Sequence, residues 1–378
     1  MTSGTDPRTA PSWPDLPEVA RAVLLEVLIH GAMPRAEIAT RLHLSRPTLT
    51  RVTRTLVLHG LLVEGETQLR SSTGRPSELL HVRGDSHHFL GVKLTADRLY
   101  ATVTDLTATV VETIEQPLTS TNPADVVARI ADIADTHPVT ALGVTLGGTV
   151  HNGVVTQAEF LRWTNVPLRD DLVEATSTPT AIDNDVQALT AAEHWFGAGA
   201  GLDSMVLITV GAGVGCGLVI DGKLVQGSHG LPPRIAHLLV DPTGPLCGYG
   251  HRGCASSYLM TDAVLRQLDG HPTYEEAVSR ARSGDPEAKE VFDNAGYALG
   301  HLIGTAANFL DPQKVLLTGD GLPLYEVSQD RVTDGIKATY EADPTFLDLD
   351  VQPFDFNEWA RSGAALAIRS TLTNQIRL

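Results

Sequence analysis

The sequence has 378 residues, enough for two or three compact units, and its 42% hydrophobic and 19% charged residues exclude a largely disordered chain. The net charge of −17 is unevenly divided: residues 1–83 carry ten Arg and no Lys against eight acidic residues, and the remainder carries 18 basic and 37 acidic residues. Only the N-terminal segment therefore suits a polyanion as a partner.

The first seventeen residues predict a flexible tail, because four prolines interrupt a polar stretch. This start has neither the basic residues nor the apolar run of a signal peptide, and we expect a cytoplasmic protein. No run of about 18 apolar residues occurs, so neither a membrane span nor a membrane partner is expected. The chain has three cysteines, which do not form a disulfide framework.

Residues 18–83 predict a DNA-binding domain that begins with three helices. Apolar residues at helical spacing predict helices over 18–30 and 35–42. Ser45 can cap a third helix, and Pro47 fits its first turn. Helix, tight turn and arginine-bearing helix are typical of a helix-turn-helix, whose second helix has the size of a major groove.

A two-stranded wing is predicted to complete this domain. Residues 60–64 and 77–82 resemble antiparallel strands, and a Gly and a Pro flank Arg75 at the tip between them. Such a narrow tip can insert a guanidinium into a minor groove. Taken alone, the arginine cluster could be a solvated helical face, and the tip could be an ordinary exposed hairpin. The combination of three helices with a two-stranded wing favours DNA binding. The candidate DNA contacts are Arg35, Ser45, Arg46, Thr48, Thr50, Arg51, Arg54 and Arg75.

Residues 84–378 predict an α/β body with two lobes. Three alternating strands follow residue 88, then a helix over 124–136 and a strand over 141–145, and the pattern restarts at Ser204. The expected lobes are roughly residues 84–185 with the C-terminal helix, and residues 186–360. A small molecule would bind in the cleft between the lobes.

A glycine-rich loop follows the strand that starts at Ser204, with glycines at 211, 213, 215 and 217. Such a loop can bring backbone close to a ligand or a phosphate, but it is equally typical of a close turn against a sheet. The pattern leaves both interpretations open. The following Asp221-Gly222 pair predicts a two-residue hairpin turn.

Several motifs together resemble the ROK family, which unites bacterial sugar kinases with winged-helix transcriptional repressors. The resemblance implies an actin-like/hexokinase-like two-lobed body that assembles as a homodimer or tetramer. The motifs are Gly74-Arg75-Pro76, Asp183-Asn184-Asp185, the 211–217 glycines, Asp221-Gly222-Lys223, Ile235-Ala236-His237, Cys247-x6-Cys254 and Leu317-Thr318-Gly319-Asp320-Gly321.

The resemblance also indicates that kinase activity is absent. A ROK kinase holds the ATP phosphates with Asp-x-Gly-Gly-Thr, and the matching position here reads Lys93-Leu94-Thr95-Ala96-Asp97. The leading carboxylate and both glycines are missing, so we expect neither ATP binding nor enzymatic activity. Asp185 matches the kinase base, and we interpret it as a residue that accepts a hydrogen bond from a ligand hydroxyl.

The matching sugar site is altered at three positions. Arg234 replaces the carboxylate of Glu-x-Gly-His, Ser256 replaces a second Glu, and Glu159 aligns with an Asn. We therefore expect a sugar-like or anionic sugar-derived effector, which Arg234 could bind as a bidentate clamp. The alternative is that Arg234 pairs with Glu159 and the pocket is vestigial. The candidate effector-binding residues are Glu159, Asn184, Asp185, Gly213, Arg234, His237 and Ser256.

The family's zinc motif is incomplete in this chain. The resemblance implies His237, Cys247 and Cys254 as ligands, but Tyr249 stands where a third thiolate is expected. A structural zinc site normally has four ligands, so His251 or water would have to complete it, and the site without zinc is the alternative. Cys216 is interpreted as a small packed residue.

These patterns together predict a homo-oligomeric transcriptional regulator, a repressor connected with carbohydrate metabolism. Two winged-helix domains would bind a palindromic double-stranded DNA operator, and the effector would alter operator affinity. One alternative is a ligand-independent DNA-binding regulator with a vestigial pocket. A less favoured alternative is an active sugar kinase that carries a DNA-binding domain.

Overall fold

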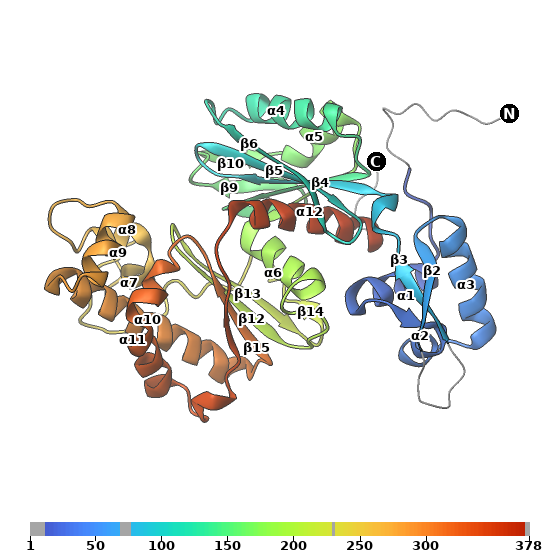
Figure 1. Cartoon of the computed structure of the whole chain (residues 1–378). Coiled ribbons are helices and arrows are strands. Elements are labelled where there is room, and N and C mark those ends of the chain that lie inside the picture. The colour runs from blue at the N-terminus through green and yellow to red at the C-terminus, as the bar shows by residue number, and fades with distance from the viewer. Residues whose placement is uncertain (1–11, 69–76, 229–230, 375–378) are drawn as a thin grey trace. The chain divides into compact units, whose positions relative to one another are not determined.

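The computed structural model describes residues 12–68, 77–228 and 231–374 (Figure 1). The chain divides into two compact units: unit 1 is residues 1–201 with 356–378, and unit 2 is residues 202–355. Both units combine helices with a central sheet, so the expected α/β fold class is confirmed. Among the described helices, none has both the length and the apolar composition that crossing a bilayer requires.

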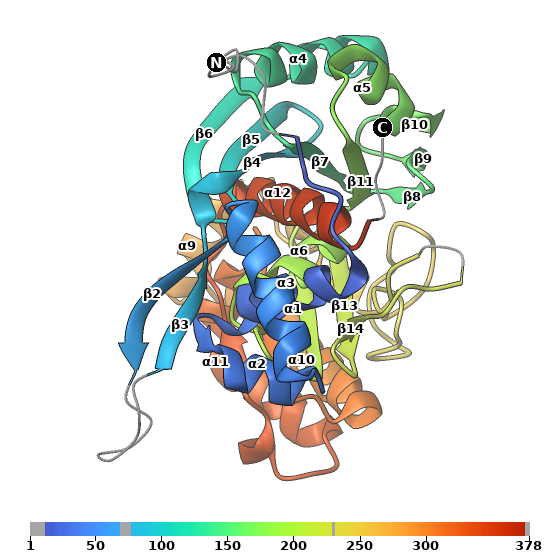
Figure 2. The same cartoon turned by 90° about the vertical axis from the view of Figure 1, so that its right-hand side faces the viewer.

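Unit 1 begins with a helical head that contains a small antiparallel sheet in the order β1-β3-β2 (Figure 2). Its core includes Leu24, Leu49 and Leu56, which the helical spacing predicted, together with Ile38 of α2. The two-residue strand β1 is not predicted from sequence because it is too short to show alternation. The elements are α1 (Glu18–His30), β1 (Met33–Pro34), α2 (Arg35–Arg41), α3 (Arg46–Leu58), β2 (Leu62–Gln68) and β3 (Ser77–Val82).

The main sheet of unit 1 has the order β11-β7-β4-β5-β6, and a smaller sheet has the order β10-β9-β8. Strands β4, β7 and β11 are parallel, whereas β5 and β6 are antiparallel to their neighbours. The elements are η1 (Gly84–Ser86), β4 (His88–Leu94), β5 (Arg98–Asp105), β6 (Val110–Pro117), α4 (Pro123–Thr136), β7 (Ala141–Leu146), β8 (Thr149–His151), β9 (Val154–Ala158), β10 (Trp163–Val166), α5 (Leu168–Thr176), β11 (Thr180–Asn184), α6 (Asp185–Phe196) and α12 (Phe356–Leu372).

Helix α12 packs directly on the backbone of this sheet, on the face opposite α4 and α5 (Figures 1 and 2). The contact is possible because Gly91, Gly143 and Ala181 lie in one row across β4, β7 and β11. A Cβ at Gly91 would lie 2.0 Å from the carbonyl oxygen of Ala360, and a Cβ at Gly143 would lie 1.9 Å from that of Gly363. Side chains any larger would therefore push the helix off the sheet.

Unit 2 has a sheet in the order β14-β13-β12-β15-β16, with α10 and α11 packed against each other. Asp221 and Gly222 both have positive φ, 51° and 66°, which confirms the predicted hairpin turn. The elements are β12 (Met205–Val210), β13 (Val214–Ile220), β14 (Lys223–Leu224), α7 (Ser256–Leu259), α8 (Thr261–Leu265), α9 (Tyr274–Arg282), α10 (Pro286–Leu310), β15 (Lys314–Thr318), α11 (Pro323–Thr339), η2 (Pro344–Phe346) and β16 (Leu349–Val351).

The contact between α12 and the sheet predicts a large loss of stability for Gly91→Ala. The new methyl group would overlap backbone atoms of α12 that cannot rotate away, so the free energy of unfolding should fall by about 2 kcal/mol or more. Chemical denaturation of both proteins measures this difference. Gly213→Ala is the control, because no atom lies within 4 Å of its new Cβ. Equal losses in the two variants would contradict the proposed contact.

A buried histidine predicts that unit 1 loses stability in mild acid. His87 lies between η1 and β4, with Nδ1 2.9 Å from Thr140 Oγ1, and its ring meets the edge of Trp13. Burial, aided by His88, lowers the pKa of His87 from 6.5 to about 4. The unfolded chain therefore binds a proton at a higher pH than the folded chain does.

The stability contributed by neutral His87 should be complete above pH 6.5 and decrease as the pH falls towards 4. The slope contributed by one such group is at most about 1.4 kcal/mol per pH unit. Urea titrations at several pH values should show a shallower decrease for His87→Gln than for the unchanged protein. The exposed His151→Gln serves as the matched control, and a slope that His87→Gln leaves unchanged would disprove the assignment.

Candidate functional site

The turn between α2 and α3 has the geometry of a helix-turn-helix. His43 adopts a positive φ of 51°, which reverses the chain direction directly after α2. The Ser45 hydroxyl then caps α3 by accepting a hydrogen bond from the Thr48 amide at 3.3 Å. Leu49 and Val52 point into the head's core, which leaves the opposite face of α3 exposed to solvent.

The exposed face of α3 carries three arginines without ion-pair partners among the described residues. Arg46, Arg51 and Arg54 are exposed, and none of them forms an ion pair with any residue that the structure describes. Thr50 is also exposed and donates its hydroxyl hydrogen to the Arg46 carbonyl oxygen. Thr48 is half-buried, beside the Ser45 cap. These residues form one polar surface, which we call the α3 face.

Arg35 differs from the arginines of the α3 face because it is neutralised within the head. Its guanidinium forms ion pairs with Glu64 and Glu78 on the two wing strands, and Nε lies 3.4 Å from Thr53 Oγ1. Arg35 therefore joins the first turn of α2 to β2 and β3. Arg75, predicted to lie at the wing tip, falls outside the described residues.

The Asp183-Asn184-Asp185 motif lies where β11 ends and α6 begins. Asn184 caps α6 by accepting hydrogen bonds from the amides of Val186 and Gln187, and its Nδ2 donates to the Gly148 carbonyl. Asp185 forms a buried ion pair with Lys93 of β4. Asp185 is predicted from sequence to bind the effector, whereas Lys93 is noted there only as a difference from the kinase motif. In the structure the two residues are ion-pair partners.

Asp183 also forms an ion pair within the chain. Its carboxylate lies 3.9 Å from the guanidinium of Arg369 on α12. Burial raises the pKa of Asp183, and the charge of Arg369 and a hydrogen bond from the Asn184 amide partly oppose this shift. The third predicted effector residue of unit 1, Glu159, is exposed and lies between β9 and β10.

The glycine loop of unit 2 is explained in part by packing. A Cβ at Gly211 would lie 1.6 Å from Asp320 Oδ1, and the Gly321 amide donates to the Val210 carbonyl at 2.9 Å. Gly211 and the 319–321 turn therefore lie against each other and leave no room for side chains, whereas residues 214–217, predicted to be part of the loop, belong to strand β13. Gly213 is different, because nothing lies within 4 Å of its Cβ position.

Three predicted effector residues lie around one loop of unit 2. The Ser256 hydroxyl is 3.3 Å from His237 Nδ1, and the positive charge of Arg234 contributes to the lowered pKa of His237. Ser256 and His237 are thus neighbours, and Arg234 lies three residues before His237 in the chain. Glu159, Asn184 and Asp185 belong to unit 1.

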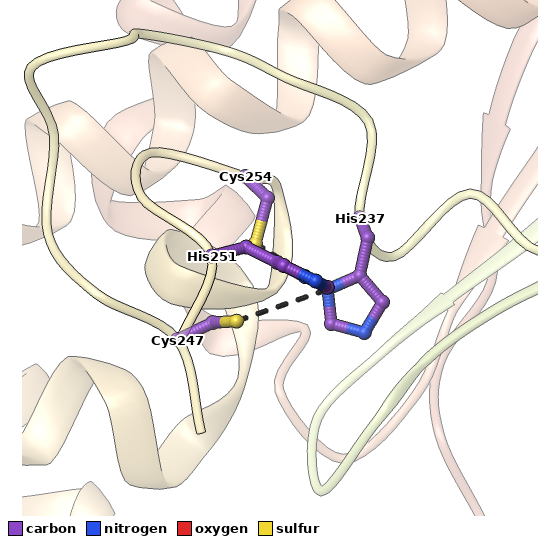
Figure 3. A group of neighbouring side chains, drawn as sticks. All are labelled: His237, Cys247, His251 and Cys254. Atoms are coloured by element: carbon purple, nitrogen blue, oxygen red, sulfur yellow. Dashed lines mark hydrogen bonds between the residues drawn. The ribbon is translucent and has the colours of Figure 1, made fainter. Parts of the chain in front are cut away.

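The same loop gathers four potential metal ligands, His237, Cys247, His251 and Cys254 (Figure 3). Their ligand atoms all lie within 4.8 Å of one another. His237 Nδ1 is 3.4 Å from Cys254 Sγ and 3.9 Å from Cys247 Sγ, close to the roughly 3.5 Å that separates nitrogen and sulfur ligands around a tetrahedral zinc ion.

His251 joins this cluster because the intervening chain makes a tight turn. The Cys247 amide donates to the His251 carbonyl at 2.8 Å, and Gly250 has a positive φ of 81°. Tyr249, which occupies the position of the missing thiolate, is 68% exposed, and its ring lies 5.1 Å from the His237 ring in an edge-to-face contact. Sequence reasoning left the fourth ligand open between His251 and water, and the structure places His251 in the cluster.

The protonation states in the cluster suit a metal ion. Burial lowers the pKa of His237, helped by the neighbouring charges of His251 and Arg234, which favours the neutral ligating form. Burial opposes ionisation of Cys247, but hydrogen bonds from the backbone amides of Tyr249 and His251 outweigh it and lower the thiol pKa. Two neutral imidazoles and two thiolates are a donor set that zinc accepts. Cys216 lies in the core, where burial raises its pKa to about 12.

Comparison with known proteins gives similarity along most of the chain. A model of the ROK family matches residues 89–341. The DNA-binding transcriptional repressor Mlc of Escherichia coli is 26% identical over 366 residues, 89% of this chain and 89% of that protein. The glucokinase of Thermotoga maritima is 31% identical over 251 residues, 57% of this chain and 79% of that protein.

A solved structure extends the similarity to the fold. The crystal structure of a ROK family transcriptional regulator described as a homologue of the E. coli Mlc protein superposes with a TM-score of 0.79 at 26% identity. The superposition covers 94% of this chain and 97% of that one. The expected two-lobed body preceded by a helical head is therefore confirmed.

The four-residue cluster predicts about one zinc ion per chain in protein purified without chelators. His251→Ala should reduce the zinc content well below one, because three remaining ligands no longer close the site. Elemental analysis of both proteins measures the ratio. The core variant Cys216→Ser is the control and should retain zinc. A ratio near zero in the unchanged protein would remove the site, and an unchanged ratio in His251→Ala would remove His251 from it.

Proposed function

The chain belongs to the ROK family, and we propose that it acts there as a sequence-specific DNA-binding transcriptional regulator, a repressor, rather than as a kinase. The similarity to the repressor Mlc supports this role because it extends over 89% of the chain, whereas the similarity to the glucokinase covers 57%. The α3 face carries the proposal: three exposed arginines follow a capped helix-turn-helix without ion-pair partners among the described residues.

The contacts with DNA follow from this geometry. Arg46, Thr50 and Arg51 would contact bases or phosphates in the major groove, and Arg54 would contact the backbone farther along α3. Ser45 and Thr48 would orient the start of the helix through the cap. Arg75 would reach the adjacent minor groove from the wing tip.

Two copies of the head would bind the two halves of a palindromic operator. Closed homo-oligomers are usually symmetric, and a two-fold axis in the protein requires a matching symmetry in the DNA. A homodimer or a tetramer satisfies this requirement. The half-sites would then be separated by whole turns of the double helix.

The body would respond to a small-molecule effector that is sugar-like or anionic and sugar-derived. In unit 2, the exposed Arg234 lies three residues before His237, which is within hydrogen-bonding distance of Ser256, and the positive charge of Arg234 suits an anionic group. Zinc, when bound, would hold the loop that carries these residues through His237, Cys247, His251 and Cys254. The effector changes operator affinity only if it binds one arrangement of the chain more tightly than another.

One observation favours the second candidate, a regulator that needs no effector. Both carboxylates of the Asp183-Asn184-Asp185 motif are paired with cations of this chain, Arg369 and Lys93. A pocket whose polar groups are already satisfied has less to gain from a ligand. Operator binding that stays constant across a metabolite library would support this candidate over the first.

The α3 face predicts the effect of removing its arginines. Selection of bound fragments from random and genomic DNA should first yield an enriched palindrome. Arg46→Ala and Arg51→Ala should then each weaken binding to it by about 1–3 kcal/mol where the lost contact is to a base. Loss of a phosphate contact should instead lower the slope of log affinity against log salt by about 0.9. Fluorescence anisotropy at several salt concentrations measures both effects.

Arg266→Ala is the matched control for these variants, because Arg266 is an exposed arginine of unit 2 that pairs with Asp262. It should leave operator affinity unchanged. If no DNA fragment is enriched, or if both α3 variants bind as tightly as the unchanged protein, the proposed regulator function fails.

A further inference from the structure

Lys93 is a charged residue of strand β4, whose residues from Phe89 to Leu94 are all buried and otherwise apolar. It lies two residues after Gly91 on β4 and therefore faces α12, because alternate residues of a strand share a face. Strand pairing places Lys93 in one row with Thr145 of β7 and Asp183 of β11. A polar row thus lies beside the row of small residues on which α12 packs.

The Lys93 ammonium group occupies one oxygen of the Asp185 carboxylate. Lys93 Nζ donates to Oδ2, while the other oxygen, Oδ1, accepts the Val186 amide at 2.9 Å. The two side chains are 6% and 10% exposed, so little water reaches the pair. Each carboxylate oxygen therefore has a donor from within the chain.

The ammonium group is also covered from the side of α12. Lys93 Nζ lies 4.9 Å from the centre of the Trp359 ring, a distance at which the negative face of an indole attracts a cation. Trp359 is itself buried, in the first turn of the helix held against Gly91 and Gly143. The lysine is thereby fixed between an aromatic ring and a carboxylate.

We propose that Lys93 is a specificity-determining residue that closes Asp185 to the hydroxyl groups of neutral sugars. A neutral hydroxyl that took its place would exchange a charge-assisted hydrogen bond for a weaker one and leave a buried ammonium group without its partner. The identity of the ligand in this inference rests on the proposed effector function, whereas the ion pair does not depend on it.

Calorimetric titration with glucose, xylose and N-acetylglucosamine tests the proposal. Lys93→Ala, or Lys93→Met if the alanine variant does not fold, should bind at least one of these sugars tenfold or more tightly than the unchanged protein. Adding Asp185→Asn to the same variant should remove the gain. Lys314→Met, which removes a lysine paired with Asp348 and Asp350 in unit 2, is the control and should gain nothing.

Two outcomes of the titrations would overturn the proposal. In the first, the unchanged protein and the Lys93 variants have the same affinity for all three sugars, including no measurable binding by either. In the second, Asp185→Asn alone weakens the binding of a neutral sugar tenfold, which would show that the carboxylate is already open in the unchanged protein.

Denaturant unfolding of the same variants tests the ion pair without any ligand. Lys93→Met and Asp185→Asn should each lower the unfolding midpoint, and the double variant should lose less than the two single losses combined, because no buried charge remains unpaired. Strictly additive losses would refute the coupling. Failure of every variant and of the unchanged protein to bind DNA would count against the regulator function, while the unfolding result would still decide the ion pair.

Discussion

The direct contact between α12 and the central sheet of unit 1 is the constraint on which the surrounding structure depends. Gly91, Gly143 and Ala181 give the sheet a row without bulky side chains, and Gly363 gives the helix a matching gap. Because the helix lies this close to the sheet, the space for every side chain between them is limited. Ala364 and Ile368 of α12 also belong to the same core as the head's buried leucines, so one helix supports both parts of unit 1.

The charged groups near this contact are arranged so that each has an internal partner. Arg369, near the end of α12, reaches Asp183, and Trp359, near its start, covers the lysine paired with Asp185. Buried carboxylates require such compensation, because desolvation of an isolated charge costs more than folding can readily supply. An aspartate at the β11–α6 junction can therefore bind a ligand or stabilise the fold. In this chain Lys93 of β4 pairs with Asp185, which favours the structural role.

Local sequence signals predicted much of the fold. Helices α1 and α3 follow from apolar spacing and from the Ser45 cap, and the Asp221-Gly222 turn follows from the need for positive φ. The place of His251 in the four-residue cluster could be named only as one possibility, since it depends on a turn that Gly250 allows. The Lys93–Asp185 pair joins residues 92 positions apart and was beyond local patterns, although a lysine within an apolar strand is a signal that a partner exists.

The assignment of residues 1–201 and 356–378 to one unit has a consequence for biosynthesis. The ribosome completes unit 2 before it makes α12, so the glycine row of the first sheet and part of the head's core remain uncovered while residues 202–355 emerge. During that interval the nascent chain exposes an apolar surface that α12 covers in the folded protein. The packing of unit 1 is therefore complete only after α12 has been translated.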